Sequence, residues 1–82
     1  MRMKKLTQEE FDQMYADGVK DFSNLDLSFL YFENKNFDGF NFFRANLSNS
    51  VFSNANLNRA YISCVDLTDA NLTNANLKGV IK

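Results

Sequence analysis

Residues 65–77 read Val-Asp-Leu-Thr-Asp-Ala-Asn-Leu-Thr-Asn-Ala-Asn-Leu, so that Leu67, Leu72 and Leu77 stand five residues apart. The same spacing runs backwards along the chain to Phe22 without interruption. So regular a period predicts a unit of five residues that is repeated in tandem. We call the large apolar residue of each unit its centre, and the twelve centres are all Leu, Phe or Ile: Phe22, Leu27, Phe32, Phe37, Phe42, Leu47, Phe52, Leu57, Ile62, Leu67, Leu72 and Leu77.

Neither regular secondary structure can bury a period of five on one side. On an α-helix, five residues advance about 500°, so successive centres would rotate by about 140° and would form no stripe. On a β-strand, an odd period places successive centres on opposite faces. A chain that turns a corner every five residues points each centre toward a common axis. The period therefore predicts a solenoid.

The units Ala45-Asn46-Leu47, Val65-Asp66-Leu67 and Ala70-Asn71-Leu72 resemble the A(D/N)LXX motif of the pentapeptide repeat family, and the resemblance covers residues 20–79. It implies an all-β solenoid, namely a right-handed quadrilateral β-helix with four pentapeptides in each coil. On this basis we expect about three coils, 20–39, 40–59 and 60–79, in a β-helix domain of residues 20–82 that is preceded by a capping segment at 1–19.

The composition of the columns agrees with a period of twenty residues. Leu27, Leu47 and Leu67 would form a column of leucines, and Phe42 would lie over Phe22. The residue two before each centre should also point inward and be small. In the later coils it is Ala, Ser or Val at every such position from Ala45 onward.

The first coil departs from this rule. Large side chains occupy the positions that should be small: Lys20, Leu25, Leu30 and Lys35, followed by Phe40 at the start of the second coil. Side chains of this size do not all fit inside a regular coil. The first coil is therefore either distorted or in contact with a segment that needs additional apolar surface.

The N-terminal segment predicts a short α-helix that can supply this contact. Thr7 and Glu10 form a capping box, and Leu6 and Phe11 have the spacing of a hydrophobic staple. Gly18 is suited to end the helix. A helix of about ten residues is marginal alone and needs a surface to lie on. We expect it to cover the first coil and prevent end-to-end stacking, and the alternative is an amphipathic helix that binds a partner.

The composition excludes most chemistry. The 82 residues include no His and a single Cys, Cys64, which is expected to be a free surface thiol. Asp66 and Asp69 have no third ligand nearby in sequence, so we expect no metal site, no cofactor and no enzyme activity. The abundant Ser and Thr side chains follow the centres at outward turn positions, Ser28 among them.

Length and charge restrict the class of protein further. A chain of this size forms one small domain, and its net charge of −1 with no basic stripe predicts no direct binding of nucleic acid. It has no apolar run of membrane-spanning length and no apolar stretch typical of a signal peptide, so we expect a cytoplasmic protein that does not enter membranes.

Two surfaces are candidates for binding a partner protein. Phe43, Arg44 and Tyr61 combine aromatic rings with a cation, a composition typical of binding hot spots, although a single exposed aromatic residue is also common on small proteins. The second surface carries acids at Asp26, Asp66 and Asp69 together with Phe29.

Members of the resembled family that bind gyrase present a DNA-like rod. The resemblance implies binding and inhibition or modulation of a nucleic-acid-handling enzyme, such as a gyrase-like or topoisomerase-like enzyme or a phage-defence nuclease, by duplex-like shape mimicry. Residues 20–79 hold six acids against five bases, so shape has to contribute more than charge. The alternative is a general protein-interaction or oligomerisation scaffold without a DNA-mimic role.

The C-terminal coil predicts a homodimer. No second helix follows it, and members of the resembled family that protect topoisomerases often dimerise through this end. Because the N-terminal helix blocks head-to-tail stacking, we expect two copies to meet at their C-terminal coils. The candidate interface residues are Leu72, Leu77, Val80 and Ile81.

Overall fold

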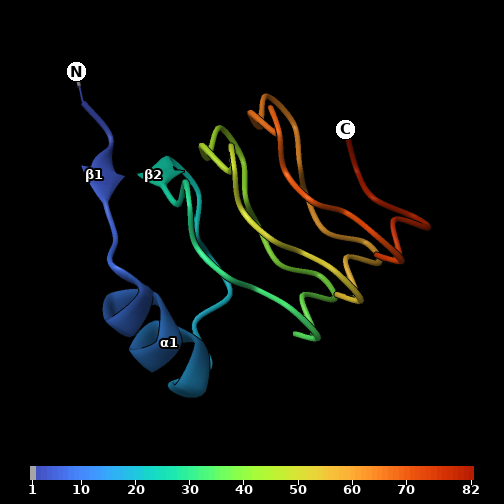
Figure 1. Ribbon diagram of the computed structural model, residues 1–82, viewed down its shortest axis with the longest axis horizontal. Helices are drawn as coiled ribbons and strands as arrows, with labels where there is room; N and C mark the ends of the chain where they lie inside the picture. The colour runs from blue at the N-terminus through green and yellow to red at the C-terminus, as the bar shows by residue number, and fades with distance from the viewer. Residues whose placement is uncertain (1) are drawn as a thin grey trace.

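The structure is a computed structural model and describes residues 2–82. Strand β1, Lys4–Lys5, leads into helix α1, Gln8–Ala16, and strand β2, Leu25–Asp26, follows. From residue 20 onward the chain winds into a stack of coils, and α1 lies across the N-terminal end of the stack (Figure 1). The whole measures 31 × 25 × 20 Å.

The winding repeats every twenty residues. Single parallel bridges join residues twenty apart along four columns, of which the first runs Asp21, Asn41, Tyr61 and Ile81. The other three columns are 26, 46 and 66; 31, 51 and 71; and 36, 56 and 76. The predicted period of twenty is therefore confirmed. Since the first coil takes part in bridges of all four columns, its large side chains do not distort the winding.

Each corner of the winding places a residue in the left-handed region. Ten non-glycine residues, each two positions after a centre, have φ between 58° and 63°, and Gly39 and Gly79 have φ of 76°. Asn tolerates this conformation better than most residues, and it occupies five of the ten positions. The corners account for five of the twelve Asn residues of this chain.

Where the residue before a centre is Asp or Asn, its side chain holds the turn closed. Asp66 Oδ1 accepts hydrogen bonds from the Thr68 amide at 3.0 Å and from the Thr68 hydroxyl at 2.6 Å. In the fourth column the Asn side chains also bond between coils: Asn56 Nδ2 donates to Asn36 Oδ1 at 3.2 Å, and Asn76 Nδ2 donates to Asn56 Oδ1 at 3.3 Å. These contacts account for Asp or Asn at this position of the repeat.

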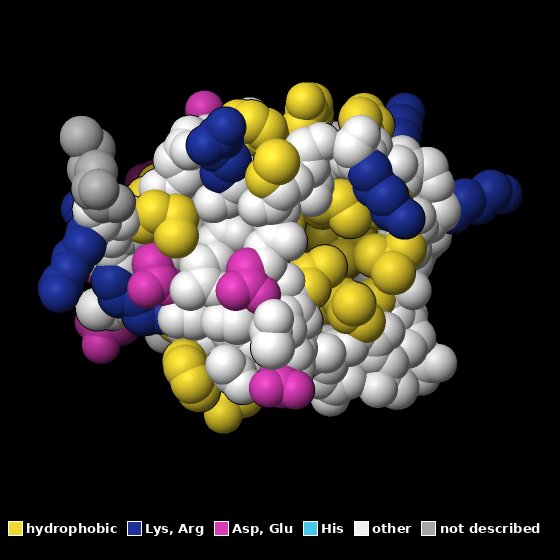
Figure 2. Space-filling model, turned by 90° about the horizontal axis from the view of Figure 1, so that it is seen from above, with side chains coloured by type: hydrophobic (Ala, Val, Ile, Leu, Met, Phe, Trp, Pro, Cys, Tyr) yellow, Lys and Arg dark blue, Asp and Glu magenta, His cyan; other side chains and the backbone are white. Residues whose placement is uncertain are grey.

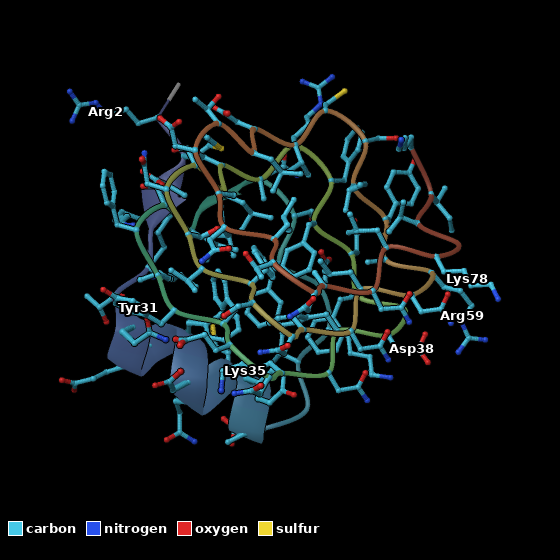
Figure 3. All side chains as sticks on the ribbon, turned by 45° about the vertical axis from the view of Figure 1, so that its right-hand side comes forward. Arg2, Tyr31, Lys35, Asp38, Arg59 and Lys78 are labelled. Atoms are coloured by element: carbon cyan, nitrogen blue, oxygen red, sulfur yellow. The ribbon has the colours of Figure 1, made fainter. Side chains whose placement is uncertain are left out.

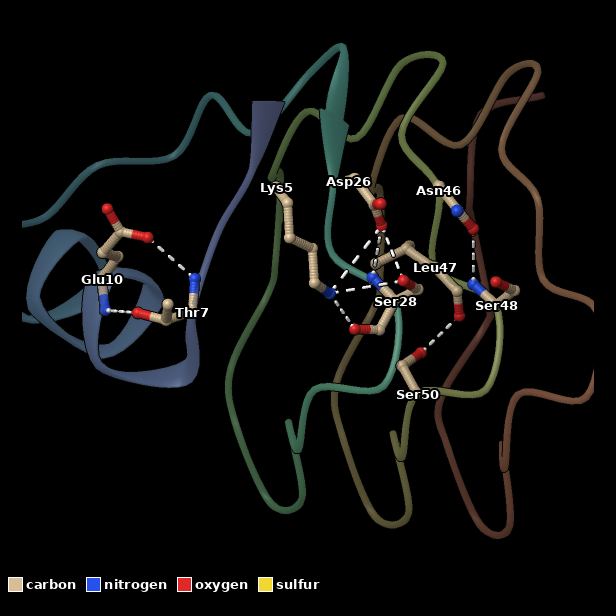
Figure 4. A network of polar contacts seen from close by, with 9 residues as sticks. All are labelled: Lys5, Thr7, Glu10, Asp26, Ser28, Asn46, Leu47, Ser48 and Ser50. Carbon is tan, nitrogen blue, oxygen red and sulfur yellow. Dashed lines mark hydrogen bonds and ion pairs between the residues drawn. The ribbon is translucent and has the colours of Figure 1, made fainter. Parts of the chain in front are cut away.

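The centres form the core. All eight centres of the first two coils are buried, and so are the small residues Ala45, Ser50, Ala55 and Ala60. The buried Ser50 hydroxyl donates to the Leu47 carbonyl at 2.6 Å (Figure 4). The centres of the third coil are only half-buried, or exposed at Leu77, because no coil covers them.

The predicted capping box of α1 is confirmed. Thr7 Oγ1 accepts from the Glu10 amide at 3.1 Å, and Glu10 Oε1 accepts from the Thr7 amide at 2.8 Å (Figure 4). At the other end, the Gly18 amide donates to the Tyr15 carbonyl and the Val19 amide donates to the Met14 carbonyl. This pair of bonds, with Gly18 at φ 83°, is a Schellman motif.

The apolar face of α1 lies on the first coil. Phe11 is 0% exposed, and its ring centroid lies 4.6 Å from that of Phe32 and 4.9 Å from that of Phe22. Leu30 and Phe40, which were too large for a regular interior, are also buried in this cluster. Because Phe11 is fully buried, the apolar face of α1 is not available to a partner.

The N-terminal segment also satisfies the exposed backbone of the first coil. Strand β1 pairs with β2 in parallel, with Lys4 opposite Leu25 and Lys5 opposite Asp26. In the third column, the Gln8 side chain accepts from the Tyr31 amide at 2.8 Å and donates to the Tyr31 carbonyl at 2.9 Å.

In the fourth column, the Tyr15 hydroxyl plays the same part. It accepts from the Asn36 amide at 3.1 Å and donates to the Asn36 carbonyl at 3.2 Å. Lys35 Nζ lies 4.9 Å from the Tyr15 ring centroid, so its charge remains at the surface above an aromatic face. Three of the four columns therefore end in hydrogen bonds to the N-terminal segment, and along these three the edge is closed to the addition of another strand.

Candidate partner-binding surface

Phe43, Arg44 and Tyr61 do come together on one side of the rod, and we call them the aromatic patch. The rings of Phe43 and Tyr61 pack edge to face with centroids 5.7 Å apart. Arg44 Cζ lies 5.2 Å from the Phe43 ring centroid. Phe43 was expected to be exposed, but it is half-buried because Tyr61 and Arg44 cover its ring, whereas Tyr61 is 40% exposed. The patch is held in place before any partner arrives.

A shallow groove adjoins the patch at Arg44. It has a volume of about 740 Å³, and the N-terminal strand forms its other side. The residues that line it are Arg2, Met3, Lys4, Asn24, Arg44 and Cys64. No pattern in the sequence indicates this groove, because only the pairing of β1 with β2 brings residues 2–4 beside the corners of the coils.

The second candidate surface carries less free charge than the sequence implied. Asp26 and Asp66 stand in one column with the neutral Asn46 between them. Lys5 Nζ lies 3.8 Å from Asp26 Oδ1 and donates to the carbonyl and hydroxyl oxygens of Ser28 (Figure 4). Ser28, which was expected to face outward, is buried because Lys5 of β1 lies over it.

Hydrogen bonds favour the ionised forms of two Asp side chains of this surface, Asp26 and Asp66. Burial raises the pKa of Asp26, but hydrogen bonds from Ser28 and the charge of Lys5 outweigh it, so this pKa lies below its usual value. The hydrogen bonds from the Thr68 hydroxyl and amide lower the pKa of Asp66. Asp69 occupies a corner with φ 58° and is exposed. Figure 2 shows acidic side chains scattered singly over the face that it presents, separated by neutral atoms.

Asp38 and Arg59 form an ion pair that the sequence did not predict. Arg59 Nε donates to Asp38 Oδ1 at 2.9 Å and its terminal Nη2 donates to Oδ2 at 2.6 Å (Figure 3). The Arg59 hydrogen bonds and charge lower the pKa of Asp38. The two residues are 21 apart, so each belongs to the corner of a different coil.

The C-terminal coil presents its predicted interface residues to different extents. Leu77 is 39% exposed and Ile81 is 50% exposed, whereas Leu72 and Val80 are half-buried against the core. Ile81 pairs with Tyr61 and so begins a further coil on one side. Figure 2 shows hydrophobic side chains gathered in a hollow toward this end of the rod, in the right half of the view.

Residues 2–82 contain neither a cluster of potential metal ligands nor a helix that could span a membrane. In that range, no three His, Cys, Asp or Glu side chains gather as metal ligands, and Cys64 is an exposed free thiol. None of its helices combines the length and the apolar character that crossing a membrane requires.

The model of the family described as pentapeptide repeats matches residues 41–79 in eight copies. A solved structure of a pentapeptide repeat protein (Rfr23) from the cyanobacterium Cyanothece 51142 is similar, with 29% identity and a TM-score of 0.71 over 74% of this chain and 42% of that chain. The structure of alr5209, a pentapeptide repeat protein from Nostoc Pcc 7120, has 26% identity and a TM-score of 0.67 over 98% of this chain and 78% of that chain. No curated protein matches the sequence.

The family match begins at the second coil, and the first coil departs from the motif because it accommodates α1. These neighbours imply a right-handed quadrilateral β-helix, the fold expected from the motif. The tandem repeats, the columns at a period of twenty and the two neighbours together identify residues 41–79 as pentapeptide repeats.

Proposed function

We propose that this protein has no enzyme activity and acts by binding a partner protein, which it inhibits or modulates. The observation that carries the proposal is the aromatic patch. Its two rings and its guanidinium are held against one another on the side of the rod, so little side-chain entropy is lost when a partner binds. Aromatic and Arg side chains are the residue types most often found at binding hot spots.

The proposed partner is a nucleic-acid-handling enzyme of the gyrase-like or topoisomerase-like kind, or a phage-defence nuclease. About three coils of β-helix, closed at one end by α1, would present a rod to a site that otherwise holds a duplex. The rod has to be recognised by shape. Two of the six acids on residues 20–79, Asp26 and Asp38, are in ion pairs, so four acids remain without an ion-pair partner within residues 2–82. B-DNA, by comparison, carries one negative charge per about 1.7 Å of its axis.

The test measures DNA supercoiling by gyrase with increasing amounts of the protein. Wild-type protein should inhibit or alter supercoiling, and Tyr61→Ala should weaken the effect about tenfold or more because it removes a ring of the patch. Tyr31→Ala is the matched control, because Tyr31 is an exposed tyrosine in another column. Equal loss in both variants would argue against the patch, and no effect of the wild-type protein would remove gyrase as the partner.

A scaffold that forms homodimers is the second candidate. The exposed Leu77 and Ile81 side chains favour it, together with the backbone of the third coil. The amides of Leu67 and Leu72 form none of the inter-coil bonds, within residues 2–82, that the Leu47 and Phe52 amides form one coil earlier. Such an edge can pair with a second copy of itself.

Light scattering tests the homodimer. A dimer should give a mass of about twice 9.4 kDa, and Leu77→Asp combined with Ile81→Asp should reduce it to a monomer. Met3→Asp, which changes an exposed apolar residue at the other end, should leave the mass unchanged. A wild-type monomer would eliminate this interface.

A further inference from the structure

The groove beside the aromatic patch combines positive charge with apolar surface. Arg2 and Lys4 extend from the N-terminal strand, Arg44 extends from the corner of the second coil, and no acid lines the groove. Met3, which is 42% exposed, supplies apolar surface between the cations. The groove therefore offers two kinds of contact within one small volume.

The positive charges of the groove have no acidic partners. Within residues 2–82, the two ion pairs engage Lys5 and Arg59 rather than any cation of the groove. Arg44 is instead fixed by its position over the Phe43 ring, and Lys4 is held in register by the pairing of β1 with β2. Three of the nine cations thus face one hollow in a protein whose net charge is −1.

Two of the three corner residues that line the groove, Arg44 and Cys64, are not the types that favour a positive φ. The column through the groove holds Asn24, Arg44 and Cys64, all with positive φ. The corner column at 34, 54 and 74 holds only Asn, and two of the three residues in the column at 39, 59 and 79 are Gly. Arg and Cys adopt the left-handed conformation at a higher energetic cost than Asn and Gly do. Phe29 and Arg59 also occupy such corners outside the groove, so this departure does not by itself indicate a ligand; at the groove it places a guanidinium and a thiol in the wall.

We propose that this groove binds an acidic peptide segment, in which side-chain carboxylates meet Arg2, Lys4 and Arg44 and an apolar side chain packs on Met3. Paired carboxylates suit the fork of donors on Arg44. Nucleic acid fits less well, because the cations gather at one corner rather than forming a track along the rod. The proposal rests on the proposed function in one respect only, that the segment would belong to a partner protein.

Fluorescence anisotropy tests the site with a labelled peptide of sequence Gly-Glu-Glu-Leu-Glu-Glu-Gly. The matched peptide with Gln in place of every Glu controls for apolar contact, and labelled oligo-dT represents nucleic acid. Lys4→Gln combined with Arg44→Gln should weaken binding of the acidic peptide about tenfold, since two charged contacts are lost. Lys78→Gln removes an exposed cation that does not line the groove and should leave the affinity unchanged.

Cys64 gives a second readout of the same site in the unmodified protein. It is the only Cys in the chain and lines the groove, so a bound peptide should slow its alkylation by iodoacetamide. The acidic peptide should protect Cys64 at the concentrations that saturate the anisotropy signal, and the Gln peptide should not.

Three outcomes would overturn the proposal. They are equal binding of the acidic and Gln peptides, tighter binding of oligo-dT than of the acidic peptide, and acidic-peptide binding that leaves Cys64 unprotected. The thermal midpoints of the variants, compared with wild type, separate lost contacts from lost folding. The peptide assays contain no partner enzyme. A negative result in them therefore does not affect the conclusion of the gyrase assay, and a negative gyrase assay does not affect the conclusion about the groove.

Discussion

Replacing Phe11 by Ala tests whether α1 is a structural part of the coil stack. The Phe11 ring is 0% exposed, with centroids 4.6 Å from Phe32, 4.9 Å from Phe22 and 6.1 Å from Phe37. Removing a buried Phe side chain lowers the free energy of unfolding by about 3–5 kcal/mol, through lost burial and the cavity that remains. The free energy of unfolding of a domain of this length is about 4–12 kcal/mol, so the loss at Phe11 is a large share of it.

Urea unfolding followed by circular dichroism measures the effect. Phe29→Ala is the matched control, because Phe29 is 69% exposed and its removal should change the free energy of unfolding by less than about 1 kcal/mol. If Phe11→Ala does not fold, Phe11→Leu gives a milder loss of about 1–2 kcal/mol from the same site. Equal small effects at Phe11 and Phe29 would refute the cap and would favour α1 as a detachable helix that binds a partner.

Three further predictions, which use four substitutions, test the winding and its corners. Leu47→Ala should lower the free energy of unfolding by about 2–5 kcal/mol in a urea titration, and Asn49→Ala at the outer corner by less than half as much; equal effects would contradict the assigned register. Phe29→Asn should raise the thermal midpoint, because Phe29 has φ 63° and buries little surface, and a fall would mean that the exposed ring is packed. The Thr68 hydrogen bonds lower the pKa of Asp66 in the folded protein. The stability that Asp66 contributes is therefore present above its unfolded pKa, near pH 4, and is lost as the pH falls further. Asp66→Asn should reduce the drop in the urea midpoint between about pH 5 and about pH 3.

The sequence predicted those features that repeat or that depend on neighbours in the chain. The centres and the capping box of Thr7 with Glu10 follow from residue types and spacing, and the period of twenty follows from the resemblance to the pentapeptide repeat motif, which the composition of the columns supports. The pairing of Lys4 and Lys5 with β2 was not predictable, because two lysines carry no strand signal and their partners, Leu25 and Asp26, lie 21 residues further along the chain.

Long-range side-chain contacts escaped prediction for a related reason. Gln8 and Tyr15 bond to the backbone of residues 23 and 21 positions later, and such a contact leaves no local pattern in the sequence. The groove was missed because it depends on the pairing of β1 with β2. The aromatic patch was predicted because its residues share one side of the winding, and only the burial of Phe43 differed.

The chemistry of the repeat itself limits how closely this rod can imitate the charge of DNA. Where the position before a centre is Asp or Asn, its side chain accepts hydrogen bonds within its own turn, and the two residue types serve there equally. Neighbouring coils are separated by about 4.8 Å, the usual spacing of strands, so two Asp residues in adjacent coils of one column would repel each other. In the second column the chain instead alternates Asp26, Asn46 and Asp66.

The alternation places successive carboxylates of a column about 10 Å apart, or twice the strand spacing. Each strand of B-DNA carries a phosphate about every 3.4 Å along its axis. In the fourth column all three positions are Asn, which form hydrogen bonds between coils that two carboxylates cannot form. Hydrogen bonding between coils therefore competes with negative charge at the same positions. A partner that recognises this protein as a duplex must respond to its width and its columns, and the aromatic patch has to supply the affinity that missing charges do not.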